Sequence, residues 1–253
     1  MKKIFLMLAV STVLFACKKE TEKEKTFKGA TVQVHDGKAW STFSVKDDGT
    51  PDQLAIVVDD AALNSLPEGG ESGHHHDNNL AVPLHPKALK STPFQFIGLD
   101  WNPAGHDPQN VYTLPHFDFH FYMMPHAEVE AMVDMSKVMI QPGAEYLPAN
   151  YVAGHPVPKM GLHWIDITSP ELNPDNPVTF TQTMILGSYN GQVNFYEPMI
   201  TSAFLRSTNT FERSIPQPAK VHVTGYYPTK MRIAKKGGET AVILEGFVLR
   251  QAS

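Results

Sequence analysis

The segment that most constrains the fold of this chain is PHFDFHFYMMP, residues 115–125. The odd positions from Phe117 to Met123 are all apolar, whereas the even positions from Leu114 to Met124 are apolar at the ends and polar in the middle. Successive side chains of a strand point to opposite faces of a sheet. We therefore expect a strand that is buried on both faces and has a polar pocket on one of them.

The rest of the chain has the pattern of an antiparallel β protein. Twenty prolines and seventeen glycines among 253 residues favour many turns and few long helices. Alternating or apolar segments predict strands within residues 30–45, 52–58, 94–102, 161–167, 178–205 and 219–251. Asn190-Gly191 is a two-residue turn signal, and it predicts a hairpin in the fifth of these segments.

Three short helices are expected between the strands. They are predicted at residues 59–67, with Asp59 or Asp60 as the N-cap, as one helical turn between prolines within 82–93, and at 126–135, where Val129, Met132 and Val133 have helical spacing. Residues 136–160 are rich in proline and predict irregular structure. The fold class is therefore mainly β, an antiparallel sheet or a barrel-like arrangement with a few short helices. No linker-like segment divides residues 29–253, which predicts a single domain.

The first seventeen residues have the layout of a bacterial export signal. A positive start, MKK, precedes an apolar run at residues 4–15 that is too short to span a bilayer as a mature helix. The run ends in LFAC, which resembles a lipobox, and Cys17 is the only cysteine in the chain. We expect a lipoprotein signal peptide that ends at a lipidated Cys17. This predicts a lipid-anchored protein of the bacterial cell envelope, on the periplasmic face or the cell surface.

Residues 18–28, KKETEKEKTFK, are charged and have no apolar period, so they predict a solvated tether between the membrane and the domain. The net charge is −5, and no basic stripe indicates a nucleic-acid partner.

Glu197 is the most informative carboxylate in the sequence. Counting outward from the Asn190-Gly191 turn places Glu197 opposite Met184, on an otherwise apolar face of the hairpin. A buried carboxylate costs several kcal/mol unless it is protonated, paired with a cation or bound to a metal. The sequence leaves two alternatives open: a salt bridge to Arg206 or Arg213, or a solvated position near a sheet edge.

Several histidines also lie at positions that predict burial. His116, Asp118 and His120 occupy one face of the central strand, and His163 lies on an otherwise apolar strand face. His116 and His120 are about 13 Å apart on a regular strand, so one ion cannot take both without a bulge. The pocket would also include Tyr122 and, from loops rich in glycine and proline, His106 and His155.

Two or three imidazoles and one carboxylate form the ligand set of catalytic zinc and of non-haem iron or manganese sites. We therefore predict a divalent metal site that draws its ligands from His116, His120, His163 and Glu197, with Asp118 orienting a histidine. A buried hydrogen-bond network without a metal is an equally sufficient explanation. The histidines of the loop at residues 68–79 could bind a metal loosely, but we expect a mobile polar loop, because nothing nearby would hold the ligands rigidly.

Three long blocks of the sequence resemble a bacterial family with a domain of unknown function. They are residues 93–125, 160–166 and 180–205, and the resemblance extends over about residues 30 to 206. The family is typified by a ring-forming protein of Thermus thermophilus that an extracytoplasmic sigma factor controls. The resemblance implies a β-rich domain, export in many members and self-association into rings, but no activity.

Three functional interpretations remain open. The first is a self-associating domain that binds a small ligand or a metal, with Trp101, Tyr189 and Tyr196 as candidate contacts. The second is a metal-dependent enzyme of the envelope, such as a hydrolase, in which ion-bound water is the nucleophile. The third is a structural lipoprotein. Hydrolase, nucleotide-binding and dinucleotide-binding motifs are absent from the sequence.

Overall fold

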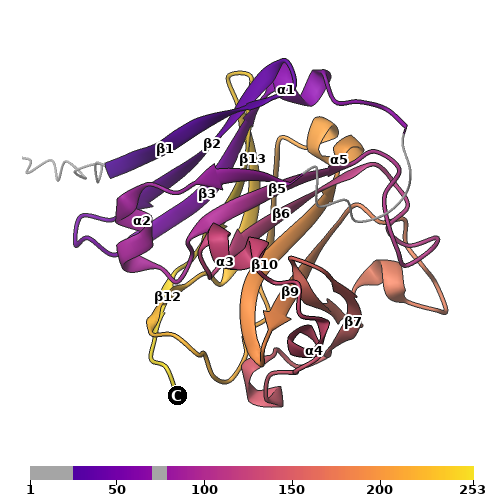
Figure 1. Cartoon of the computed structure of the whole chain (residues 1–253). Coiled ribbons are helices and arrows are strands. Elements are labelled where there is room, and N and C mark those ends of the chain that lie inside the picture. Colours follow the sequence, from indigo (N-terminus) through magenta and orange to yellow (C-terminus); the bar gives the residue numbers. More distant parts are fainter. Residues whose placement is uncertain (1–24, 70–78) are drawn as a thin grey trace, which may run out of the picture.

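The computed structural model describes residues 25–69 and 79–253, and the described chain is mainly β, as predicted (Figure 1). Two large antiparallel sheets, of six and seven strands, lie face to face, and a two-stranded ribbon accompanies them. Neither large sheet closes on itself within the described residues, so the barrel-like alternative is not realised. Cys17 and the histidines at residues 74–76 lie outside the described residues.

The six-stranded sheet has, in spatial order, β1 (Lys25–Val34), β2 (Gly37–Val45), β3 (Pro51–Asp59), β14 (Glu239–Glu245), β13 (Lys230–Lys236) and β11 (Thr210–Ser214). The seven-stranded sheet has β4 (Leu80–Pro83), β5 (Phe96–Asn102), β6 (His116–Tyr122), β10 (Gln192–Thr201), β9 (Gln182–Tyr189), β8 (Gly161–Asp166) and β7 (Tyr151–Val157). The ribbon pairs β12 (Gly225–Tyr227) with β15 (Val248–Arg250). Strand β1 begins at Lys25, so the last four residues of the predicted tether at residues 18–28 belong to the sheet.

The helices are all short. They are α1 (Asp60–Asn64), α2 (Pro86–Ser91), α3 (His126–Glu130), α4 (Met135–Val138) and α5 (Ser202–Ser207), with 3₁₀ turns η2 (Ala144–Tyr146) and η3 (Pro170–Leu172). Helix α1 begins as predicted, because the Asp59 side chain accepts a hydrogen bond from the amide of Ala62. No helix among the described residues is long and apolar enough to cross a membrane.

Two predictions for residues 126–160 are wrong in detail. The helix predicted at 126–135 ends at Glu130, and Val133, which was assigned to its buried face, is 67% exposed. Residues 136–160 contain a strand, β7, as well as turns. Strand β7 lies at the edge of its sheet and is mostly exposed, so it has no apolar alternation from which to predict it.

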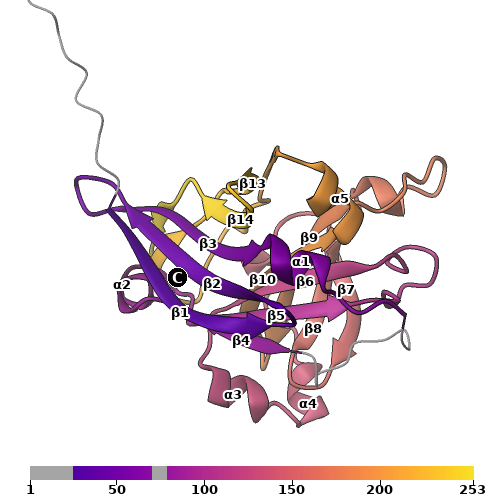
Figure 2. The same cartoon turned by 90° about the horizontal axis from the view of Figure 1, so that it is seen from above.

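The larger core lies between the two sheets. Phe43 and Leu54 of the six-stranded sheet and Phe117, Phe119 and Phe121 of β6 are all part of it. Every residue of β6 is buried, so β6 is the two-sided strand that its alternation predicted. Its even-numbered residues therefore face the outer side of the seven-stranded sheet. Helices α3 and α4 lie on that side, away from β1 to β3 (Figure 2).

Strands β9 and β10 form the predicted hairpin. Asn190 and Gly191 have φ angles of 50° and 76°, as a two-residue hairpin turn requires. A β-bulge between Val193 and Phe195 then shifts the register by one residue. The extra residue is Asn194, whose buried side chain donates a hydrogen bond to the carbonyl of Met160 at 2.9 Å.

The bulge corrects the predicted partners of Glu197. Glu197 pairs with Ile185, not Met184, and Met184 and Leu186 pack in the larger core on the other face. Phe195 pairs with Gly187, where a Cβ atom would lie 2.0 Å from the Phe195 ring. Because Gly187 has no side chain, the Phe195 ring can lie directly over β9.

Candidate metal centre

The outer face of the seven-stranded sheet brings together six buried acidic and imidazole side chains. They form two groups of three, and within each group one ligand atom per residue lies within 4.8 Å of the others. The glutamate group is His120, His163 and Glu197; the aspartate group is His106, His116 and Asp118. All six are buried. Each group can therefore hold a metal ion.

The glutamate group joins three strands. His120 comes from β6, His163 from β8 and Glu197 from β10. The Nε2 atom of His120 lies 3.5 Å from Oε1 of Glu197, and Nε2 of His163 lies 3.7 Å from Oε2. Neither oxygen of Glu197 has a hydrogen-bond partner among the described residues.

The other nitrogen of each ring has a contact of its own. Nδ1 of His163 lies 3.2 Å from the carbonyl oxygen of His155, and Nδ1 of His120 lies 2.9 Å from Oδ2 of Asp100. A histidine that binds a metal usually donates its second ring N–H to a carbonyl or a carboxylate. The two rings thus point their Nε2 atoms at Glu197, as metal ligands would.

Burial and charge shift the protonation of the glutamate group. Burial raises the pKa of Glu197 to about 8 and lowers the pKa of His163 to about 3. Burial also lowers the pKa of His120, but the charge of Glu197 and the contact with Asp100 outweigh it and raise that pKa to about 9. A bound cation would remove the need to keep a proton on this carboxylate.

The aspartate group joins a loop to β6. His106 lies in the loop of residues 103–115, and His116 and Asp118 lie on the strand. Nε2 of His106 is 3.3 Å from Oδ2 of Asp118, and Nε2 of His116 is 3.1 Å from Oδ1. Asn102 of β5 donates a hydrogen bond of 2.8 Å to Oδ2 of Asp118.

Opposite charges decide the pKa values in this group. Burial lowers the pKa of His106, but the carboxylate of Asp118 outweighs burial and the net pKa is raised. Burial likewise raises the pKa of Asp118, but His116 and His106 outweigh it and hold that pKa well below its ordinary value.

The structure divides the predicted ligands differently from the sequence. His116 and His120 belong to separate groups, in line with their expected separation on the strand. Asp118 and His106, which were assigned to the pocket, form with His116 a group that could hold a metal ion. Tyr122 is buried beside His120, with ring centroids 5.4 Å apart. The side chain of His155 is exposed, and only its carbonyl reaches the site.

Two residues of β5 contribute to the site but were not predicted. Asp100 pairs with Asp118 across the strands, and Asn102 pairs with His116, so both face the same side of the sheet. Their alternation in LDWN, with Trp101 between them, is the signal that could have revealed them.

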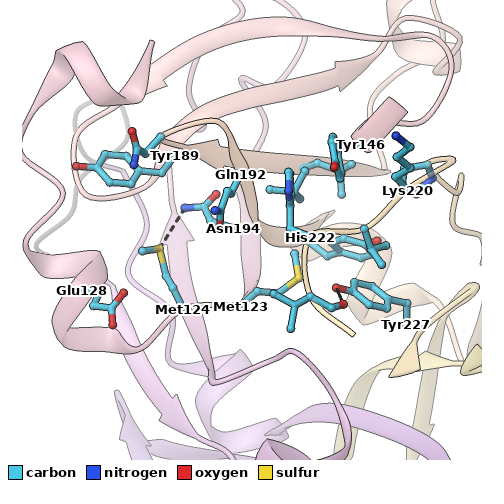
Figure 3. Close-up of a pocket in the computed structure, with 17 residues that line it drawn as sticks. Met123, Met124, Glu128, Tyr146, Tyr189, Gln192, Asn194, Lys220, His222 and Tyr227 are labelled. Carbon is cyan, nitrogen blue, oxygen red and sulfur yellow. Dashed lines mark hydrogen bonds between the residues drawn. The ribbon is translucent and has the colours of Figure 1, made fainter. Parts of the chain in front are cut away.

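A cavity of about 280 Å³ lies away from both groups, between the β9–β10 hairpin and residues 218–227. Figure 3 shows Tyr189, Asn194 and Met124 on one side of it and His222 and Tyr227 on the other. Tyr189 and Tyr196, predicted as exposed aromatic contacts for self-association, both line this cavity, and Tyr196 is buried. Trp101 lines a different cavity and donates a hydrogen bond to the carbonyl of Pro67.

Comparisons with protein-family models, with curated proteins and with solved structures found no match for this chain. The resemblance to the bacterial family with a domain of unknown function therefore stays a prediction from the sequence. Support for a function comes from the chain's own residues, above all from the two buried groups that can hold a metal ion.

Proposed function

We propose that this chain is a lipid-anchored protein of the bacterial cell envelope that binds a zinc ion in the glutamate group. One observation carries the proposal: the fully buried carboxylate of Glu197 lies between the Nε2 atoms of His120 and His163, without a hydrogen bond to either oxygen. A buried carboxylate whose oxygens have no hydrogen bond is costly unless it is protonated, paired with a cation or bound to a metal.

A metal ion explains the spacing of the group better than hydrogen bonds do. Hydrogen bonds between nitrogen and oxygen are typically about 2.7–3.2 Å long, whereas the two contacts of Glu197 are 3.5 and 3.7 Å. Zinc bound tetrahedrally at about 2.0–2.2 Å holds neighbouring ligand atoms roughly 3.4 Å apart. Two histidines and a carboxylate also suit non-haem iron, but the near-tetrahedral spacing favours zinc.

The ion would link β6, β8 and β10, so its main role is to hold the sheet together around a polar interior. A hydrolase, the alternative from the sequence, needs substrate to reach the open coordination position of the metal. His163 is only 5% exposed and the other two side chains are fully buried. This burial favours a binding and structural role over catalysis.

The test is the zinc content of full-length protein, purified in detergent without an affinity tag. Glu197→Gln should lower the content by one ion per chain relative to wild type. The matched control is His126→Ala with Glu130→Gln, because this exposed pair has a similar contact of 3.6 Å. The control should keep the wild-type content. Wild-type zinc content in Glu197→Gln protein would overturn the proposal.

The anchor is tested separately. Cys17→Ser should move the protein from the membrane fraction to the soluble fraction of the envelope, because the acyl chains that hold it are lost. A variant that stays with the membrane after washing at high salt and high pH would contradict lipid anchoring.

A second candidate function is the binding of a small aromatic ligand in the 280 Å³ cavity. Aromatic rings line its wall, and two buried polar atoms, Oδ1 of Asn194 and Nε2 of His222, have no hydrogen-bond partner among the described residues. Calorimetric titration with indole should show saturable binding. Val223→Trp, at a half-exposed position on the cavity wall, should block it. Equal heats in both proteins would remove this candidate.

We also propose that the chain associates with itself. The support is a run of exposed apolar side chains in and around α4: Val133, Met135, Met139 and Ile140. Sedimentation should show an oligomer that Met139→Lys with Ile140→Lys dissociates. A monomeric wild-type protein would contradict the proposal.

A further inference from the structure

We infer that the aspartate group is a second metal site, separate from the glutamate group, and that its ion fastens the loop of residues 103–115 to β6. The proposed ligands are Nε2 of His106, Nε2 of His116 and a carboxylate oxygen of Asp118, and zinc is the metal used to test the site. The inference does not depend on the glutamate group, because the two sets share no residue.

Hydrogen bonds to the backbone orient both rings. Nδ1 of His106 lies 2.7 Å from the carbonyl oxygen of Asp107, and Nδ1 of His116 lies 2.7 Å from that of Leu114. A carbonyl oxygen only accepts, so each Nδ1 carries the hydrogen. In the neutral ring the lone pair is then on Nε2, and both Nε2 atoms face Asp118.

With both rings neutral, the lone pairs of the two Nε2 atoms point at the buried carboxylate of Asp118. Nε2 of His116 and Oδ1 of Asp118 are 3.1 Å apart, and neither has a hydrogen-bond partner among the described residues. Lone pairs that face each other at this distance repel unless a proton or a metal cation lies between them. The distances of 3.1 and 3.3 Å are close to those between ligand atoms that share a zinc ion, roughly 3.4 Å.

Neighbouring side chains hold Asp118 and His116 in place, as the groups around metal ligands usually do. Asn102 donates to Oδ2 of Asp118 at 2.8 Å, which fixes the rotation of the carboxylate. The ring of Phe180 packs edge-on against His116, with centroids 5.5 Å apart. Both contacts hold the ligands in place and keep bulk water away.

The two sites hold separate ions rather than a bridged pair. Asp118 and His120 are two residues apart on β6, a spacing of about 6.5 Å along a strand. Bridged catalytic pairs have their metals about 3.5–4 Å apart. Each group also has its own carboxylate and its own two imidazoles, so each is complete without the other.

The aspartate site fixes a loop, whereas the glutamate site links strands. His106 is the only ligand of either group that comes from residues 103–115. Tyr112 in the same loop packs near the His106 ring, with centroids 6.1 Å apart. Loss of the aspartate-site ion should therefore loosen this loop, and loss of the other ion should not.

Zinc stoichiometry of the full-length protein, stripped with chelator, reloaded with zinc and desalted, tests the inference. We expect two ions in wild type, one in Asp118→Asn, one in Glu197→Gln and none in the double variant. Asp118→Asn with the wild-type content would overturn the second site, and loss of both ions in this variant would overturn their separateness. A single wild-type ion that only Asp118→Asn removes would support this site and refute the glutamate site.

Hydrogen exchange gives a readout that does not depend on counting ions. His106→Gln changes no residue of β6 and should speed amide exchange at residues 103–115 in zinc, to the rate of chelator-treated wild type. Glu197→Gln should leave the loop rate unchanged. Equal loop exchange in wild type with and without zinc would overturn the inference.

Discussion

Glu197 on β10 and His120 on the neighbouring strand β6 lie 3.5 Å apart, from Oε1 to Nε2, and both side chains are fully buried. His163 approaches the other oxygen of Glu197 from β8. Three strands thus meet through polar groups on the outer side of a sheet whose other side packs as an apolar core. A bound cation reconciles this arrangement with the cost of burial.

Zinc should stabilise the wild-type protein against unfolding. A ligand at one hundred times its dissociation constant adds about 2.7 kcal/mol to the free energy of unfolding. Chelator should therefore lower the melting temperature of wild type, and it should lower that of Glu197→Gln by less. The exposed control, His126→Ala with Glu130→Gln, should respond to chelator like wild type. An equal response in Glu197→Gln would contradict the glutamate site as a source of this stability.

Without metal, the stability of wild type should fall as pH rises from 6.5 to 8. The folded-state pKa values of Glu197, about 8, and His120, about 9, are raised above their ordinary values. The stability that such groups contribute is present below the ordinary pKa and is lost as pH rises through the folded value. His163 has a lowered pKa, so its own contribution changes only below pH 6.5.

Denaturant titrations in chelator across this pH range provide the measurement. Glu197→Gln lacks the titrating carboxyl, so its stability should fall less steeply than that of wild type. Parallel slopes for the two proteins would show that the carboxyl is not held neutral in the fold.

Asp100→Asn and Asn102→Ala should weaken different sites. Asp100 contacts His120 and Asn102 supports Asp118, so each substitution removes a group that orients one set of ligands. Changes of this kind typically cost about 10–100-fold in metal affinity. Competition with a chromophoric chelator should show Asp100→Asn weakening the ion that Glu197→Gln removes. Asn102→Ala should weaken the ion that Asp118→Asn removes. The opposite assignment would be evidence against the two groups as defined.

Gly187→Ala should destabilise the protein by about 1–3 kcal/mol, the usual cost of overpacking. A Cβ atom at Gly187 would lie 2.0 Å from the ring of Phe195, and this ring packs against His120 and His163. The matched control is Gly225→Ala, where the nearest atom is 3.4 Å away. Chemical denaturation should show a small effect at Gly225, and zinc affinity should fall only in Gly187→Ala. Equal effects at both glycines would contradict this packing.

The alternation of residues 115–125 was enough to predict a strand buried on both faces, because its period of two follows directly from strand geometry. The burial of Glu197 was also predictable, although by counting that did not include the bulge. The local sequence pattern gives no sign of the bulge at Asn194. The bulge depends on a hydrogen bond to Met160 and on the missing side chain at Gly187, which only the fold brings together.

The division of the site into two groups could not be predicted from the sequence. Strand spacing showed that His116 and His120 are far apart, but their partners come from elsewhere in the chain. His106 reaches Asp118 through a loop that returns to the start of β6, and no periodicity describes such a path. Asp100 and Asn102 face the site because of the register between β5 and β6, which is set by contacts over a long range.

A crystal structure of the zinc-loaded protein, with anomalous data on both sides of the zinc edge, would show whether Glu197 binds a zinc ion. We expect an anomalous peak within about 2.0–2.2 Å of Nε2 of His120, Nε2 of His163 and an oxygen of Glu197. A map without a peak there, with the Glu197 carboxyl hydrogen-bonded to ordered water, would contradict this expectation.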